Sequence, residues 1–277
     1  MKNFFERTIR FYLASISAIL LALVILSPAF ARGNSQRDDN TLIIGATPVP
    51  HAELLNLIRD DMAALGFNLR VVEFTDFVQP NMALLAGDLD ANFFQHIPYL
   101  QTNEEWASRM VPAFGVHIEP FGLYSTRHGS INDLPNGASI AIPNDPSNGG
   151  RALLLLENYG LITLREGVGL TATIRDIVSN PRNFRIRELE AALLPRALSD
   201  VDAATINGNF ALQAGFSPLR DSLIIEGPES PYVNVVVTMR GNEQSPAIEA
   251  LRTALLSDRV RDHINRTWSD GSVVPVF

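Results

Sequence analysis

Residues 88–94 read DLDANFF, and residues 200–206 read DVDAATI. In each case a helical pattern precedes the aspartates, and an apolar run typical of a buried strand follows them. Earlier in each half, a short β-branched run leads into a loop, at 41–46 in the first half and at 138–143 in the second. The same order of elements therefore occurs twice, about a hundred residues apart.

The full pattern predicts the order β-α-β-α-β in each half. In the first half we expect strands at 41–46, 68–74 and 89–94, with helices at 54–65 and 80–86. In the second half we expect strands at 138–143, 184–189 and 201–206, with helices at 151–158 and 191–198. Any α/β protein repeats such units, so the argument depends on the shared order and the shared turn. Repeated β-α units predict parallel strands, and hence two similar α/β lobes.

Two further strand-like passages, at 116–124 and 232–239, join the halves. Ser245 and Pro246 then open a C-terminal helix, as N-cap and first helical residue. Its apolar contacts with the first lobe would come from Leu251, Leu255 and Trp268. We therefore predict a first lobe made of residues 41–121 and 236–277, and a second lobe of residues 122–235. Two crossovers between lobes form a hinge, and the cleft beside it is where a small ligand would bind.

Composition excludes several functions. The chain of 277 residues has a formal net charge of −8 and contains no cysteine. An acidic protein repels phosphates, so we do not expect nucleic acid as a partner. Without cysteine there are no disulfides, thiolate metal sites, cysteine nucleophiles or lipids attached through a thiol.

Residues 1–31 have the pattern of a secretory signal. Basic residues precede an uncharged run at 11–26, and Ala29 and Ala31 stand at positions −3 and −1 of a cleavage site. We therefore predict export with cleavage after Ala31, and a polar tether at 32–40. An uncleaved membrane anchor is the alternative, although the uncharged run is shorter than the roughly 20 residues that a spanning helix needs.

Arg151 follows the sequence NDPSNGG at 144–150, which we expect to be a loop before a buried helix. In or just before the first turn, a cation opposes the positive end of the helix dipole, whereas free backbone N–H groups attract an anion. A bound carboxylate or phosphate would resolve this conflict, and a bidentate pair with arginine contributes roughly 1.5–3 kcal/mol. A salt bridge to Asp145 or Glu157 explains Arg151 equally well. The loop lacks the lysine of a nucleotide-binding P-loop, which disfavours a nucleotide.

The loops after the third strand of each lobe supply the other candidate binding residues. They are Phe93, Phe94, His96 and Tyr99 in the first lobe, and Asn207 and Asn209 in the second. Ligands of open α/β sheets bind beyond the carboxyl ends of the strands, so both loops should face the cleft. An aromatic wall opposite amides and an arginine suits a zwitterion with a soft side chain. Alternatively, the two phenylalanines belong to the core, and the asparagines serve a turn at Gly208.

Six blocks of sequence resemble the methionine-binding lipoproteins of bacterial ABC importers, the NlpA type. The blocks are GATPVPHAE (45–53), EFTDFVQPN (73–81), LDANFFQHIPYL (89–100), IPNDPSNGGRALLLL (142–156), LPRALSDVDAATINGN (194–209) and SPYVN (230–234). The resemblance implies a two-lobed periplasmic-binding-protein fold, similar to type 2. It also implies free L-methionine or a close relative in the cleft, and delivery to an inner-membrane ABC permease with a cytoplasmic ATPase.

The resemblance also implies roles for particular residues. Arg151 would hold the α-carboxylate with Asn148 beside it, and Asn209 and Asn234 would fix the amino and carboxylate groups. The side chains enclosing the thioether would be Phe77, Phe94, His96 and Tyr99. Each contact of sulfur with an aromatic ring contributes about 0.3–1.5 kcal/mol.

Two departures from the family pattern matter. Members are usually tethered by a lipid on a cysteine after the signal, and this sequence has none. The protein would therefore diffuse freely in the periplasm or keep its apolar N-terminus as an anchor. Position 77 is Phe where members often have Tyr, so a hydroxyl contact from there is lost, which bears on ligand preference.

Enzyme and metal functions have weaker support in the sequence. The five histidines form no pair at i, i+4 or HExxH spacing. His117 and Glu119 could reach one ion, although a strand with alternating faces explains them better. No GxSxG or SxxK nucleophile motif is present, and we expect Asp90 and Asp202 to have a structural role near strand starts. We thus predict no enzyme activity, cofactor or metal.

The alternatives that the sequence leaves open belong to different functional classes. One is an enzyme acting on an amino-acid-like substrate. A second is a binding protein for another small amino acid or a methionine-containing dipeptide. A third is a surface interaction protein that keeps the scaffold without a transporter.

Overall fold

The computed structural model describes residues 40–227 and 230–277. The expected signal at 1–31, and the expected tether except for its last residue, lie outside the described residues. Within the described part, no helix combines the length and the apolar character needed to cross a membrane.

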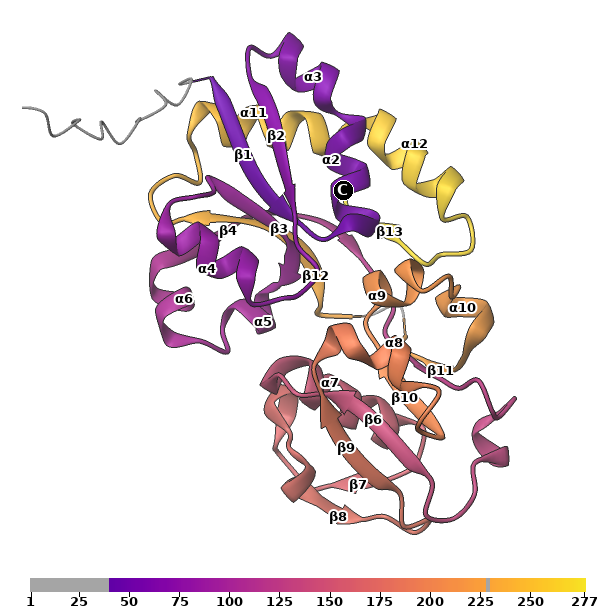
Figure 1. The fold of residues 1–277 in the computed structure, drawn as a ribbon. Coiled ribbons are helices and arrows are strands. Elements are labelled where there is room, and N and C mark those ends of the chain that lie inside the picture. The colour runs from indigo at the N-terminus through magenta and orange to yellow at the C-terminus, as the bar shows by residue number, and fades with distance from the viewer. Residues whose placement is uncertain (1–39, 228–229) are drawn as a thin grey trace, which may run out of the picture. The chain divides into compact units, whose positions relative to one another are not determined.

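Two mixed sheets organise the described residues, one in each lobe (Figure 1). The first sheet has the order β13-β4-β12-β3-β1-β2. Its strands are β1 (Thr41–Ala46), β2 (Asn68–Glu73), β3 (Ala91–His96), β4 (Met110–Ile118), β12 (Val233–Met239) and β13 (Val274–Pro275). β1 pairs in parallel with β2 and β3, as the repeated β-α order predicts, whereas β12 pairs antiparallel with both β3 and β4.

Helices cover both faces of the first sheet. They are η1 (Pro48–Ala52), α2 (Glu53–Leu57), α3 (Arg59–Ala64), α4 (Gln79–Ala86), α5 (Ile97–Leu100), α6 (Glu104–Arg109), α11 (Pro246–Leu255) and α12 (Asp258–Thr267). The C-terminal helices α11 and α12 lie beside α2 and α3, although they are far apart in the sequence (Figure 1). Leu251, Leu255 and Trp268 belong to the core between them, which confirms the predicted contacts of the C-terminus with the first lobe.

The second sheet has the order β11-β5-β10-β6-β9, and β6 pairs in parallel with β9 and β10. Its strands are β5 (Gly122–Tyr124), β6 (Ser139–Pro143), β9 (Arg185–Leu189), β10 (Ala203–Ile206) and β11 (Ser222–Ile225), and a separate pair is β7 (Thr163–Leu164) and β8 (Ile177–Ser179). The helices are α7 (Pro146–Asn158), α8 (Leu194–Ala197), α9 (Gly208–Gln213) and α10 (Pro218–Asp221), with short turns η2 (Ile131–Asp133), η3 (Gly169–Thr171), η4 (Ile174–Asp176) and η5 (Ala191–Leu193).

The aspartates of the repeated turn have the same structural role in both lobes. Asp90 accepts a hydrogen bond from the backbone N–H of Ile43 at 2.7 Å, and Asp202 accepts one from Ser139 at the same distance. Their own N–H groups donate back to the carbonyls of Ile43 and Ser139. Each aspartate thus joins the start of its lobe's third strand to the first, which confirms the structural role expected of this pair.

Three predicted helices differ from the structure, and the one expected at 191–198 is divided into η5 and α8. The helix expected at 54–65 is divided at Ile58, whose φ of −97° and ψ of 10° separate α2 from α3. The helix expected to begin at Arg151 begins at Pro146, with Asp145 as N-cap. The expected loop 144–150 was therefore wrong: its last five residues form the first turns of α7, because the Asp145 carboxylate accepts from the N–H of Asn148 at 2.8 Å.

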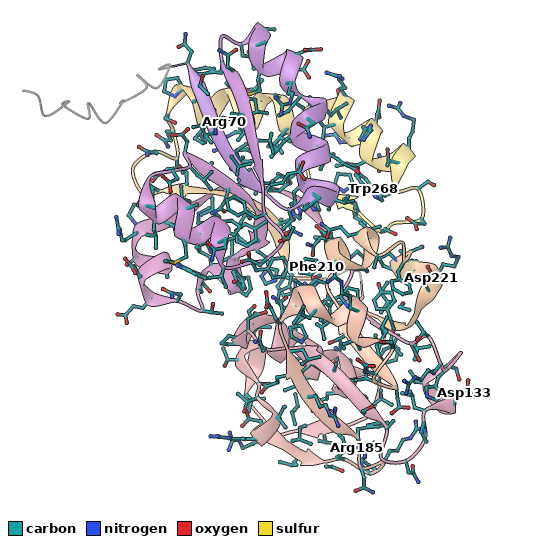
Figure 2. The ribbon with its side chains drawn as sticks, in the orientation of Figure 1. Arg70, Asp133, Arg185, Phe210, Asp221 and Trp268 are labelled. Carbon is teal, nitrogen blue, oxygen red and sulfur yellow. The ribbon has the colours of Figure 1, made fainter. Side chains whose placement is uncertain are left out.

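One apolar core belongs to both lobes. It includes Phe77, Phe94 and Tyr99 from the first lobe, and Ala204 and Phe210 from the second. The rings of Phe77 and Phe210 lie 4.7 Å apart, and Phe210 is labelled where the lobes meet in Figure 2. The lobes therefore share packed side chains as well as the two crossovers.

Candidate functional site

A small cavity of about 20 Å³, which is room for roughly one water molecule, lies between the lobes. Its walls come from β3, α5 and β12 of the first lobe, from the N-terminal parts of α7 and α9 of the second, and from the crossover after β4. The lining residues are Phe77, Phe94, Gln95, His96, Tyr99, Glu119, Asn148, Arg151, Asn207, Gly208, Asn209 and Asn234.

Nine of the ten candidate binding residues line this cavity, and Phe93 does not. Neighbouring side chains of a strand face opposite sides of the sheet, so Phe94 faces the cavity and Phe93 the opposite core. The Phe93 ring packs against His51 and His117 at 4.6 and 5.4 Å between centroids. The prediction of Phe93 as a cleft residue was wrong for this reason.

Arg151 is nearly buried at the cavity wall, with 5% of its side chain exposed. Its Nε donates to Glu226 Oε1 at 3.0 Å, and its Nη2 donates to Glu226 Oε2 and to the Glu119 carbonyl oxygen. The guanidinium also stacks on the ring of Tyr232 at 4.1 Å. Among the described residues, Nη1 makes no hydrogen bond, so one edge of the guanidinium is available to a ligand.

Three expectations about Arg151 were wrong. It is the sixth residue of α7 and does not stand at the N-terminus, so the helix dipole does not explain its position. The second expectation was an anion bound at the start of this helix, but the Asp145 side chain already caps that end. The acidic partner is Glu226, which is distant in the sequence, and neither Asp145 nor Glu157 fills this role.

A hydrogen-bonded chain of two asparagines and one histidine joins the lobes beside Arg151. Asn148 Oδ1 accepts from Asn207 Nδ2 at 2.8 Å and lies 3.2 Å from His96 Nε2. The backbone N–H of Tyr99 donates to His96 Nδ1, which leaves Nε2 as the protonated nitrogen that donates to Asn148. Burial, and next the Arg151 charge, lower the pKa of His96 to about 3, so this histidine is neutral at pH 7.

Aromatic rings form the opposite part of the wall. Phe77 lies 5.9 Å from both Phe94 and Tyr99, measured between ring centroids. The Tyr99 hydroxyl donates to the Phe77 carbonyl oxygen at 2.9 Å, which fixes the loop that carries Phe77. The phenol is thereby turned away from solvent, and the wall is apolar where the rings meet.

Several buried polar atoms near the cavity have no hydrogen-bond partner among the described residues. They include Asn207 Oδ1 and Asn209 Nδ2, both on lining residues. Buried polar groups in native proteins are rarely left unpaired, so such atoms indicate a ligand or ordered water in the cavity.

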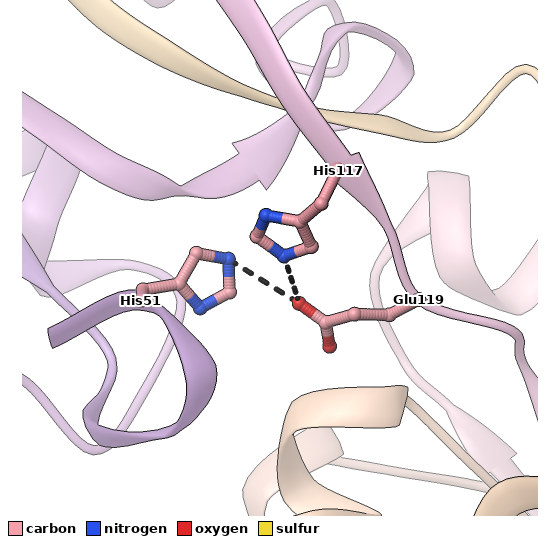
Figure 3. A group of neighbouring side chains, drawn as sticks. All are labelled: His51, His117 and Glu119. Carbon is pink, nitrogen blue, oxygen red and sulfur yellow. Dashed lines mark hydrogen bonds and ion pairs between the residues drawn. The ribbon is translucent and has the colours of Figure 1, made fainter. Parts of the chain in front are cut away.

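The sequence reasoning missed Glu119 as a lining residue. Its Oε1 lies 2.8 Å from His117 Nε2 and 3.4 Å from His51 Nε2 (Figure 3). These three side chains are almost fully buried, and their nearest donor atoms all lie within 4.8 Å of one another, which is compatible with a metal ion. Sequence spacing indicated that His117 and Glu119 could reach one ion, but it gave no indication of His51, which η1 brings to the end of β4.

The cavity and its lining define a two-lobed α/β binding protein, in which a polar wall and an aromatic wall face each other between the lobes. A family model described as NlpA lipoprotein matches residues 42–277. The chain belongs to the NlpA lipoprotein family, which confirms both the resemblance and the predicted fold class.

Relatives match over nearly the whole chain. Membrane lipoprotein TpN32 of Treponema pallidum is 42% identical, covering 95% of this chain and 98% of its own. The D-methionine-binding lipoprotein MetQ of Escherichia coli K12 is 37% identical, covering 94% and 96%. A nutrient-binding protein of Burkholderia cenocepacia, solved bound to methionine, is 42% identical with a TM-score of 0.82, covering 85% of this chain and 100% of that one.

Proposed function

We propose that this protein is a solute-binding protein that captures L-methionine or a close relative and delivers it to an ABC permease and its ATPase. The observation that carries the proposal is the cavity between the lobes, with a partly free guanidinium on one wall and aromatic rings on the other. The methionine bound to the Burkholderia relative supports the choice of ligand.

The free edge of Arg151 is the proposed site for the α-carboxylate. Glu226 holds the guanidinium by Nε and Nη2, and so directs the remaining nitrogen without competing for it. The nearby amides of Asn148, Asn209 and Asn234 supply further hydrogen bonds to the polar end of the ligand. A charge-assisted pair of this kind is roughly twice as strong as a neutral hydrogen bond.

The aromatic wall is the proposed site for the thioether. Phe77, Phe94, Tyr99 and neutral His96 offer ring faces and edges, with which sulfur makes favourable contacts. Because residue 77 is Phe, this wall lacks a hydroxyl at that point, which favours an apolar tail over a polar one.

The proposed mechanism involves no covalent chemistry. A ligand that contacts both lobes stabilises the closed arrangement, and the closed form is the one presented to the permease. Export follows the predicted signal, with cleavage after Ala31. We expect protein recovered from the periplasm to have the intact mass of a chain beginning at Arg32, whereas a full-length chain in the membrane fraction would support the anchored alternative.

Calorimetric titration of Arg151→Ala tests the proposed carboxylate site. We expect L-methionine affinity to fall at least tenfold, about 1.4 kcal/mol, in a variant that still unfolds cooperatively. Arg220→Ala is the matched control, because Arg220 is exposed and forms an ion pair with neighbouring Asp221. Unchanged affinity in folded Arg151→Ala would refute the assignment. Methionine recovered chemically altered after incubation with the wild-type protein would favour the enzyme alternative.

A further inference from the structure

Burial raises the pKa of Glu119, so the ionised form of this carboxylate needs a compensating positive charge nearby. Its side chain is 5% exposed and lines the cavity. Within the described residues, no arginine forms an ion pair with its carboxylate, since Arg151 contacts only the Glu119 carbonyl oxygen and pairs with Glu226. A buried charge is costly unless a partner compensates it, so a cation in the cavity is expected to face Glu119.

The two histidines beside Glu119 do not supply that cation. Burial lowers the pKa of His51 to about 4 and that of His117 to about 3, so both imidazoles are neutral at pH 7. They are nevertheless well placed to donate. The Thr47 hydroxyl lies 2.8 Å from His51 Nδ1, and if it donates there, the His51 proton is on Nε2, facing Glu119.

A metal ion in the cluster is a weaker explanation of the geometry. Two ligands about 2.0–2.1 Å from a tetrahedral zinc ion lie about 3.3 Å apart. His117 Nε2 and Glu119 Oε1 are only 2.8 Å apart, which is a hydrogen-bond distance. The backbone N–H of Asn209 also donates to the carboxylate, so neutral donors already surround it.

We propose that His51 and His117 are positioning residues that hold Glu119 as the counter-charge for the ammonium group of an α-amino acid ligand. His117 donates its Nε2–H to Oε1 at 2.8 Å, and His51 Nε2 lies 3.4 Å from the same oxygen, so both imidazoles lie against one oxygen of the carboxylate (Figure 3). Arg151 and Glu119 then form a pair of opposite charges that selects a zwitterion. This inference rests on the proposed function, because it assigns the remaining charged group of the same ligand.

The test compares L-methionine with 4-(methylthio)butanoate, which keeps the carboxylate and the thioether but lacks the ammonium group. We expect the wild-type protein to prefer methionine at least tenfold in calorimetric titration at pH 7. In Glu119→Gln, which keeps the shape and loses the charge, methionine affinity should fall to about that of the analogue. Affinity for the analogue should stay within about threefold of wild type.

Variants at His117 separate positioning from mere structural support. His117→Leu removes the donor and should reduce the preference for methionine at least tenfold, whereas His117→Gln keeps an N–H donor and should restore part of it. His263→Leu on α12 is the control and should leave the preference unchanged. The inference would be overturned if a variant lost affinity for both ligands equally, or if Glu119→Gln still preferred methionine over the analogue.

The remaining outcomes distinguish this inference from the function on which it rests. Wild-type protein that binds neither ligand would refute the proposed function itself. Wild-type protein that binds methionine with no preference over the analogue would refute only the role of Glu119. Stoichiometric zinc in the purified protein, with methionine affinity that falls on chelation, would also overturn it in favour of a metal site.

Discussion

Gly208 is the position where one added methyl group should do most damage to the site. It is the first residue of α9, and a Cβ there would lie 2.6 Å from Glu119 Cβ and 2.9 Å from Glu119 Oε2. Both distances are shorter than real Cβ contacts allow, so Gly208→Ala must displace either Glu119 or the start of α9. Glu119 has little freedom to move, because His117 hydrogen-bonds its carboxylate at 2.8 Å and its side chain is buried.

The expected cost of Gly208→Ala is the difference of two effects. Overpacking a filled site costs typically about 1–3 kcal/mol, whereas alanine stabilises a helix by up to about 1 kcal/mol relative to glycine. We therefore expect a net loss of about 1–2 kcal/mol in the free energy of unfolding. Because the displaced groups line the cavity, methionine affinity should fall at least tenfold as well.

Urea denaturation and calorimetric titration measure the two effects of Gly208→Ala. The matched control is Gly129→Ala, where the added Cβ makes only an ordinary contact of 3.8 Å with Asp133. The control should bind methionine as the wild type does. If Gly208→Ala matched the control in both assays, the close approach of α9 to Glu119 would not exist in solution.

Two further predictions follow from the same structure. Asp202→Ala should lower the free energy of unfolding by about 1–3 kcal/mol, because the N–H of Ser139 loses its acceptor. Asp258 is exposed, so Asp258→Ala is the control and should leave the free energy of unfolding unchanged. An unchanged urea midpoint in Asp202→Ala would contradict the role of Asp202 at the strand start. Stability should also fall as the pH decreases below 6.5. His51, His96 and His117 have pKa values lowered by burial to about 4, 3 and 3, so the unfolded chain binds more protons there, and each histidine contributes a slope of up to about 1.4 kcal/mol per pH unit. Burial raises the pKa of Glu119, and this shift stabilises the folded protein as the pH falls, so it offsets part of the slope from the histidines. If the urea midpoint did not change between pH 7 and pH 5, the burial of neutral histidines would be contradicted.

Local patterns were sufficient to predict most of the fold. β1 begins and ends as the apolar run at 41–46 predicts, and Gly66 ends α3 with a φ of 90°, which favours glycine. The repeated aspartate turns predicted two related lobes, because each turn fixes a strand start through its own carboxylate. These features depend on residues close together in the sequence or on a pattern that occurs twice.

The errors concern residues whose partners are distant in the sequence. Arg151 and Glu226 are 75 residues apart, and neither local spacing nor helix polarity identifies that pair. Asp145 as N-cap lengthens α7 through a glycine-bearing stretch that resembles a loop. His51 reaches Glu119 only because η1 folds back toward the end of β4, and a search by histidine spacing along the chain cannot detect that approach.

The contacts between the lobes bear on how a ligand would control this protein. His96 of the first lobe meets Asn148 of the second, Phe77 packs on Phe210, and Glu119 accepts from the N–H of Asn209. These contacts are made by protein groups alone, so they stabilise this arrangement of the lobes before any ligand contributes. A protein that is partly closed without ligand binds more tightly, because a larger fraction is competent to bind. The same contacts must break before the ligand can leave. These contacts and the bound ligand together stabilise the closed arrangement. Delivery would therefore require a permease that stabilises the open arrangement by a larger free energy.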